Sequence, residues 1–94
     1  MNYNKILELK FYSNDLDEEL SIKDFFKRLL KKLFEEGEGF SGKRPFGNSG
    51  WQYDLCACLI EKGIVNGEID EDGDVEECDW AFFDMIIQRL IESL

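Results

Sequence analysis

Eight carboxylates lie within twelve residues in the last third of the chain and form its densest group of chemically active side chains. Such a run can keep an exposed hairpin soluble, hold a divalent cation, or oppose a basic surface as a mimic of a phosphate backbone. We expect a protein-binding acidic face that consists of Glu68, Asp70, Glu71, Asp72, Asp74, Glu76 and Glu77.

Calcium binding is an alternative function for the same run. The sequence aligns with an EF-hand loop when Gly73 takes the sixth position. The candidate ligands are then Glu68, Asp70, Asp72, Asp74 and Asp79. Glu68 stands where such loops carry Asp, and Asp79 stands where a longer Glu chelates the ion with both oxygens. We therefore expect weak, nonspecific binding of divalent ions rather than a calcium site.

The three cysteines are Cys56, Cys58 and Cys78, an odd number that leaves one thiol over in any disulfide framework. We expect reduced, partly buried thiols. A zinc site would need a carboxylate as its fourth ligand. Cys56 and Cys58 would also project about 200° apart if they lie on one helix, which prevents them from converging on one ion.

A glycine-rich stretch at residues 42–51 is a second candidate site. It places cations and possible helix caps just before a predicted helix, where free backbone amides can hold a phosphate or a carboxylate. The candidate anion-binding residues are Lys43, Arg44, Asn48 and Ser49. The pattern is not that of a Walker loop, which has Gly-Lys-Ser/Thr directly before the helix. The alternative is a packed loop anchored by Phe46 and Trp51.

Composition narrows the functional classes. The chain has 94 residues, with 21 Asp and Glu, 11 Lys and Arg, no His, and a net charge of −10. Histidine-based metal sites and catalytic dyads are excluded, and the net charge opposes binding to nucleic acid or to anionic membranes. We expect a single domain over residues 1–94 with no catalytic residue, no cofactor and a protein partner.

The charge is unevenly distributed along the chain. Residues 64–94 hold ten acids and only one cation, Arg89. A predicted helix from Ser21 onward has a cationic face opposite its apolar face, made of Lys23, Lys27, Arg28, Lys31 and Lys32. This face is either a solvated helix back or, together with the loop at 42–51, a nucleic-acid or phosphate-binding surface.

Hydrophobic periodicity predicts the elements that position these groups. Apolar residues at steps of three and four predict helices over 22–34, 51–62 and 80–94, the last capped by Asp79. The middle helix is apolar around most of its circumference and should be the most buried. Residues 64–77 predict a hairpin in which Gly73 is left-handed and Ile69 faces Val75.

The N-terminal residues 6–12 alternate between apolar and charged positions and predict a strand, whereas residues 13–20 read as a loop. We predict an α+β fold of three helices with a small antiparallel sheet, formed by this strand and the acidic hairpin. Phe82 and Met85 fall outside the apolar arc of the last helix and are candidates for a homodimer or partner contact. No apolar run is long enough to span a membrane, so we expect a cytoplasmic protein.

A family resemblance is carried by Gly42-Lys43-Arg44-Pro45-Phe46-Gly47-Asn48-Ser49-Gly50-Trp51, by Asp54, Leu59, Ile60 and Gly63, and by Asp70-Glu71-Asp72-Gly73. In these residues, about half of the chain, the sequence resembles small uncharacterised bacteriophage and prophage proteins. The resemblance implies a bacterial cytosol and an accessory role, such as stoichiometric binding to host machinery, including host-defence proteins. It assigns no activity to any residue.

Overall fold

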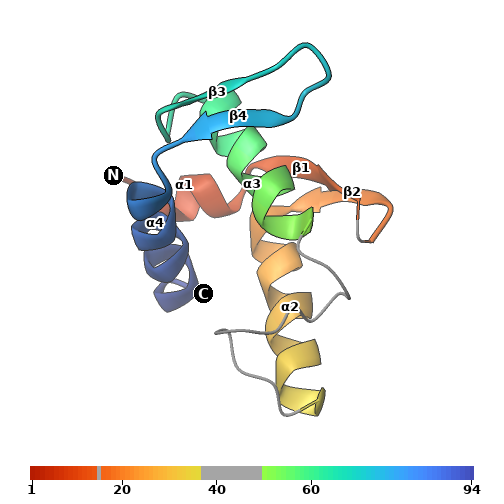
Figure 1. Cartoon of the computed structure of the whole chain (residues 1–94). Coiled ribbons are helices and arrows are strands. Elements are labelled where there is room, and N and C mark those ends of the chain that lie inside the picture. Colours follow the sequence, from red (N-terminus) through yellow and green to blue (C-terminus); the bar gives the residue numbers. More distant parts are fainter. Residues whose placement is uncertain (15, 37–49) are drawn as a thin grey trace.

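The computed structural model describes residues 1–14, 16–36 and 50–94 and confirms the α+β class. The elements follow one another as α1 (Tyr3–Leu7), β1 (Lys10–Ser13), β2 (Glu18–Ser21), α2 (Ile22–Glu36), α3 (Gly50–Glu61), β3 (Gly67–Ile69), β4 (Val75–Cys78) and α4 (Trp80–Glu92). In Figure 1 the β3–β4 hairpin lies at one end, over α3, whereas α2 and α4 extend away from it. The described part of the chain has four helices, one more than predicted.

The additional helix is α1, whose last two residues, Ile6 and Leu7, lie in the segment 6–12 that we predicted as a strand. Asn2 caps it, since its Oδ1 accepts a hydrogen bond from the Lys5 amide at 3.3 Å. The consecutive residues Ile6 and Leu7 are both buried, which a one-sided strand does not allow but a short helix does. The N-terminal strand therefore begins only at Lys10, where β1 starts.

The predicted pairing of the N-terminal strand with the acidic hairpin is wrong. β1 instead pairs with β2, which lies in the segment we predicted as a loop, and the two hairpins form separate two-stranded sheets. Asp17 takes a left-handed conformation at φ 53°, and its carboxylate accepts a hydrogen bond from the Tyr12 hydroxyl, which raises the pKa of Tyr12. Phe11 and Leu20 are register partners, and both are buried. A tight local turn thus gives β1 its partner.

Helix α2 confirms the strongest periodic signal in the chain. Ser21 caps it, with its Oγ accepting a hydrogen bond from the Asp24 amide at 3.1 Å. Phe25 and Phe26 are fully buried, and the Phe25 ring lies 5.2 Å from Phe11 and 5.8 Å from Trp51 between centroids. These rings join β1, α2 and α3 into one core.

Helix α3 is the central element, as predicted. Leu55, Cys56 and Leu59 are fully buried on it, and Trp51 and Cys58 are nearly so. It ends at Glu61, and Gly63, two residues later, has a φ of 73°, the left-handed conformation that follows the end of many helices. Because α3 contacts β1, β3 and β4, it is the support on which both hairpins rest.

Candidate acidic interface

The acidic residues lie on the β3–β4 hairpin and its loop, residues 67–78, called here the acidic hairpin. Ile69 is the register partner of Val75, and Gly73 has a φ of 88°, so both predicted features of the turn are confirmed. Val75 and Cys78 pack against the core. The inward positions of β4 thus fix the hairpin to the domain and leave its acids on the outside.

Two of these acids oppose each other directly. Glu68 on β3 is the register partner of Glu77 on β4, and both side chains are exposed. The register shifts between Glu68 and Ile69, which leaves Glu76 as an additional exposed residue of β4. Like charges that face each other across two strands destabilise the pair. The hairpin therefore carries its charge at a cost in stability.

The acidic hairpin makes no ion pair within the part of the chain that the structure describes. Ion pairs between described side chains join Arg28 to Glu18 and Arg89 to Glu92, and none reaches residues 67–78. The exposed carboxylates of the hairpin are therefore open to pairing with a cationic surface.

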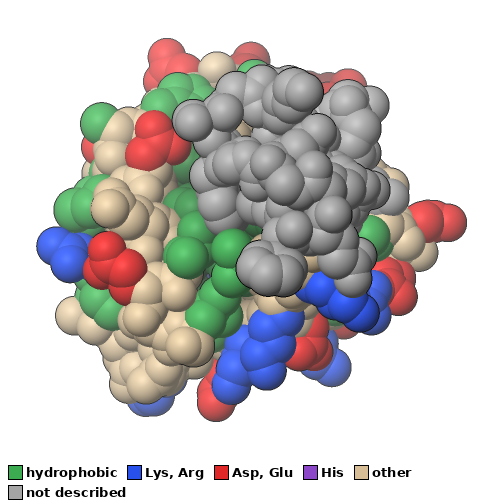
Figure 2. All heavy atoms as spheres, turned by 90° about the horizontal axis from the view of Figure 1, so that it is seen from below, with side chains coloured by type: hydrophobic (Ala, Val, Ile, Leu, Met, Phe, Trp, Pro, Cys, Tyr) green, Lys and Arg blue, Asp and Glu red, His purple; other side chains and the backbone are tan. Residues whose placement is uncertain are grey.

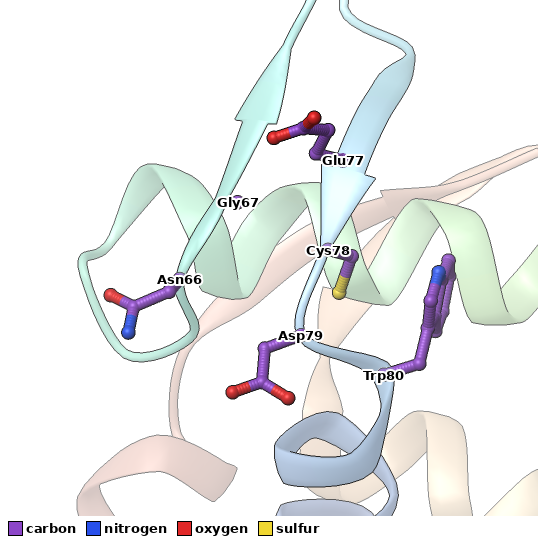
Figure 3. A pocket seen from close by; sticks show the side chains of 6 residues that line it. All are labelled: Asn66, Gly67, Glu77, Cys78, Asp79 and Trp80. Carbon is purple, nitrogen blue, oxygen red and sulfur yellow. The ribbon is translucent and has the colours of Figure 1, made fainter.

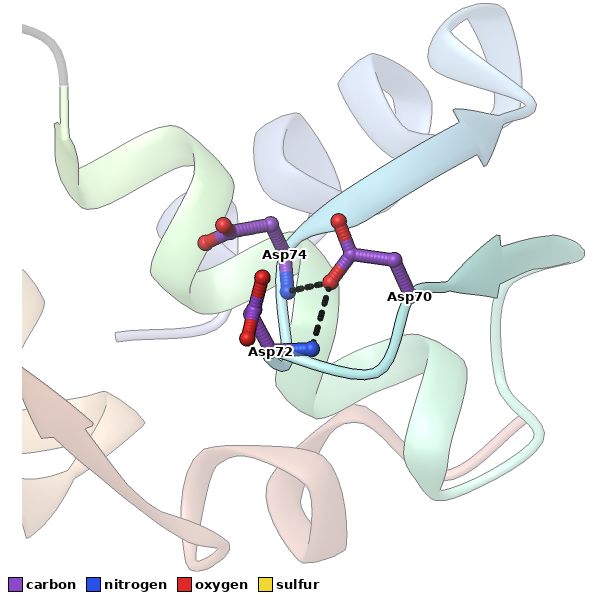
Figure 4. A group of neighbouring side chains, drawn as sticks. All are labelled: Asp70, Asp72 and Asp74. Atoms are coloured by element: carbon purple, nitrogen blue, oxygen red, sulfur yellow. Dashed lines mark hydrogen bonds between the residues drawn. The ribbon is translucent and has the colours of Figure 1, made fainter.

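Asp70 differs from the other acids because it organises the loop. Its Oδ1 accepts hydrogen bonds from the amides of Asp72 and Asp74, both at 2.9 Å (Figure 4). Its own amide donates to the Asp74 carbonyl at 2.8 Å, and its carbonyl accepts from the Gly73 amide at 3.1 Å. The side chains of Glu71, Asp72 and Asp74 are exposed and make no such contacts, so they are the free carboxylates of the loop.

The structure brings together only part of the predicted calcium-ligand set. Carboxylate oxygens of Asp70, Asp72 and Asp74 lie within 4.8 Å of one another. Glu68 instead faces Glu77 across the strands, and Asp79 caps α4 by accepting a hydrogen bond from the Phe82 amide at 3.2 Å. Strands rather than helices flank the loop, which is not the EF-hand arrangement.

We therefore expect millimolar calcium to shift the thermal unfolding midpoint no more than millimolar magnesium does. Both ions screen the clustered carboxylates, but one oxygen of Asp70 is already engaged by two amides. Differential scanning fluorimetry checks this. A larger shift with calcium that disappears in Asp72→Asn would show that the loop is a calcium site.

Gly67 fixes the hairpin to α3 and was not singled out from the sequence. A Cβ at this position would lie 2.4 Å from the Glu77 carbonyl oxygen and 2.6 Å from Cδ1 of Ile60 on α3. Neither the paired backbone nor the packed side chain leaves room for a methyl group. The requirement for glycine here is steric, because β3 passes closely between its partner strand and the helix.

Gly67→Ala is expected to destabilise the protein by about 1–3 kcal/mol, as overpacking does. The amides of β3 and β4 should also exchange hydrogen faster relative to those of α2, because the hairpin is displaced from α3. Denaturant unfolding and hydrogen-exchange mass spectrometry measure the two effects. Asn66→Ala, at the exposed neighbouring position, should stay within about 0.5 kcal/mol of the natural protein. Equal stability of the two variants would contradict the steric argument.

The predicted anion site cannot be placed, because Lys43, Arg44, Asn48, Ser49 and Phe46 lie outside the described residues. Trp51 is described and is buried in the core. On the helix, Lys23, Lys27, Arg28 and Lys31 are exposed, and Arg28 pairs with Glu18. In Figure 2 Lys and Arg side chains gather at the lower right, with Asp and Glu side chains among them.

The two candidate contact residues of α4 differ in exposure. Phe82 is half-buried and packs against the core, whereas Met85 is 42% exposed. Trp80 is also partly exposed, and its ring contacts Tyr53 at 5.5 Å between centroids. A partner contact at Phe82 and Met85 stays a prediction. Of the two side chains, Met85 is the more exposed.

The cysteines of α3 point to different elements, as their spacing predicted. The Cys56 Sγ lies 2.7 Å from the Cys78 Sγ of β4, whereas the Cys58 thiol donates to the Lys10 carbonyl of β1 at 3.9 Å. Burial raises the pKa of Cys58. The thiols of Cys56 and Cys58 therefore diverge toward β4 and β1 rather than toward one point.

No family model, characterised protein or solved structure matches this sequence or this fold in the comparisons made. None of the helices in the described ranges is long and apolar enough to cross a membrane.

Proposed function

We propose that this protein acts without catalysis, by binding a basic surface of another protein through its acidic hairpin. The observation that carries this proposal is the exposed Glu68–Glu77 pair, in which two carboxylates face each other and neither makes an ion pair with a described side chain. The repulsion between these two carboxylates lowers the stability of the free protein, and a cationic surface of a partner would relieve it.

The way the hairpin is held supports the same function. Gly67 packs against Ile60, and Cys56 of α3 contacts Cys78 at the end of β4. Asp70 orders the loop through its backbone hydrogen bonds. The carboxylates are therefore presented on an ordered frame, which reduces the entropy lost when a partner binds.

The class of partner follows from the spacing of the charges. Neighbouring strands lie about 4.8 Å apart, and alternate residues of one strand about 6.7 Å apart, so the carboxylates form a compact array of negative charge. A protein whose basic groove binds a phosphate backbone is the partner that such an array fits. The phage resemblance favours an accessory role against a nucleic-acid-handling or defence protein in the bacterial cytosol.

An affinity capture from bacterial lysate tests the proposal. The tagged protein should retain a host protein at low salt, release it at high salt, and retain it after nuclease treatment, because surface ion pairs are screened by salt. Loss of capture on nuclease treatment would instead indicate a nucleic-acid site on the basic face of α2. Capture that salt does not weaken would contradict an electrostatic interface.

A further inference from the structure

We propose that Cys56 and Cys78 form a reversible disulfide that locks the base of the acidic hairpin to α3, which makes this pair a redox-dependent modification site. The inference is independent of the partner-binding function, because it concerns the thiols and not the carboxylates. It starts from the contact between the two sulfurs, which lie 2.7 Å apart and share a hydrogen bond.

The geometry requires little movement. The sulfurs of a disulfide are about 2.0 Å apart, so the two thiols need to approach by only about 0.7 Å. The two cysteines are 22 residues apart in sequence and lie on elements that already pack together, α3 and β4. Cys58 is not a competitor, because it lies toward β1 and contacts the Lys10 carbonyl.

Access to the pair comes from the side of Cys78. Cys56 is fully buried, whereas Cys78 is half-buried and lines an open pocket of about 500 Å³ with Asn66, Glu77 and Trp80. Figure 3 shows the Cys78 sulfur directed to the side of β4 opposite the Glu77 and Asp79 carboxylates. Burial, together with the hydrogen bond to Cys78, raises the pKa of Cys56. The accessible thiol, Cys78, is therefore the one that meets an oxidant first.

The chemistry is thiol–disulfide exchange with a small disulfide such as oxidised glutathione. Cys78 loses its proton, and its sulfur attacks one sulfur of glutathione disulfide, which releases one glutathione as a thiolate that takes up a proton. Cys56 then loses its proton and attacks the Cys78 sulfur of the mixed disulfide, which releases the second glutathione as a thiolate that takes up a proton. Two protein thiols are oxidised to one disulfide, and one glutathione disulfide is reduced to two thiols.

The bond would change the mobility of the hairpin. In the reduced protein the end of β4 is held by packing and hydrogen bonds alone. A covalent link to the buried helix limits local opening of β3 and β4 and constrains the unfolded chain. In a reducing compartment such a bond is transient, so the hairpin has a free state and a locked state set by the glutathione redox balance.

Titration of the purified full-length chain in glutathione buffers, from fully reduced to fully oxidised, tests this proposal. Alkylation of the free thiols followed by mass spectrometry should show loss of two of the three cysteines. Peptide mapping should find Cys56 joined to Cys78. The thermal unfolding midpoint should rise by about 10 °C or more and return on reduction.

Three variants make the outcome unambiguous. Cys58→Ser is the matched control and should behave like the natural protein. Cys56→Ser should leave Cys78 as a mixed disulfide with glutathione and without the rise in midpoint, and Cys56→Ala serves where the serine is not tolerated. The proposal is overturned if all three thiols of the natural protein stay free in the oxidised buffer, or if Cys58 is found in the bond.

Discussion

Replacing Glu68, Asp72, Asp74 and Glu77 by their amides should weaken binding of the captured partner by roughly five-fold to a thousand-fold. Each of these side chains is exposed, and contacts between exposed opposite charges contribute about 0.2–1 kcal/mol each. Four of them together contribute about 1–4 kcal/mol, which sets this range in Kd. Asp70 is left unchanged because it holds the loop. Titration of the immobilised variant with the partner measures the loss.

A control with the same change in charge separates the hairpin from the overall field of the protein. Glu8, Glu19, Glu61 and Asp84 are exposed acids outside the hairpin, and their replacement by amides removes four charges as well. This variant should keep a Kd within a few-fold of the natural protein. Equal losses in the two variants would show that net charge, and not the hairpin, determines affinity.

Phe25→Ala should lower the free energy of unfolding by about 3–5 kcal/mol, the usual cost of a large cavity in a core. Phe25 is fully buried and contacts the rings of Phe11, Phe26 and Trp51. Because small domains are stable by only about 5–15 kcal/mol, this single change should bring the protein close to unfolding at room temperature.

Denaturant unfolding followed by circular dichroism measures the effect of Phe25→Ala. Met85→Ala on α4 is the control, since Met85 is 42% exposed and its truncation should change stability by less than about 0.5 kcal/mol. If Phe25→Ala costs no more than the control, the ring cluster is not the centre of the core.

The parts of the fold that the sequence predicted correctly are those governed by local chemistry. The periodicity of α2 and α4, the caps at Ser21 and Asp79, and the left-handed Gly73 each depend on a few neighbouring residues. The acidic hairpin was predicted for the same reason, because its turn residues and its alternating strands are adjacent in the chain.

The pairing of the N-terminal strand was predicted wrongly because its partner strand is not fixed by local sequence. Residues 10–13 could pair with any nearby strand, and the alternation of apolar residues does not say which. The turn at Asp17, stabilised by Tyr12, decides the pairing, but an acidic stretch gives little sign of a strand. α1 was missed because five residues are too few to show helical periodicity.

The candidate site was predictable in composition but not in geometry. The acidic residues were identified by counting charges along the sequence. That Glu68 lies opposite Glu77 depends on the strand register, which a bulge between Glu68 and Ile69 shifts. The steric role of Gly67 and the contact between Cys56 and Cys78 join segments distant in sequence. Such contacts follow from tertiary packing, so they cannot be predicted from a local sequence pattern.

Carboxyl footprinting of the protein with and without its captured partner tests the central claim most directly. A carbodiimide couples an amine to accessible carboxylates, and mass spectrometry then reports the labelling of each one. We expect the partner to protect Glu68, Asp72, Asp74 and Glu77, while Glu8 and Glu61 are labelled equally in both states. Unchanged labelling of the hairpin, together with protection elsewhere, would show that the acidic hairpin is not the binding surface.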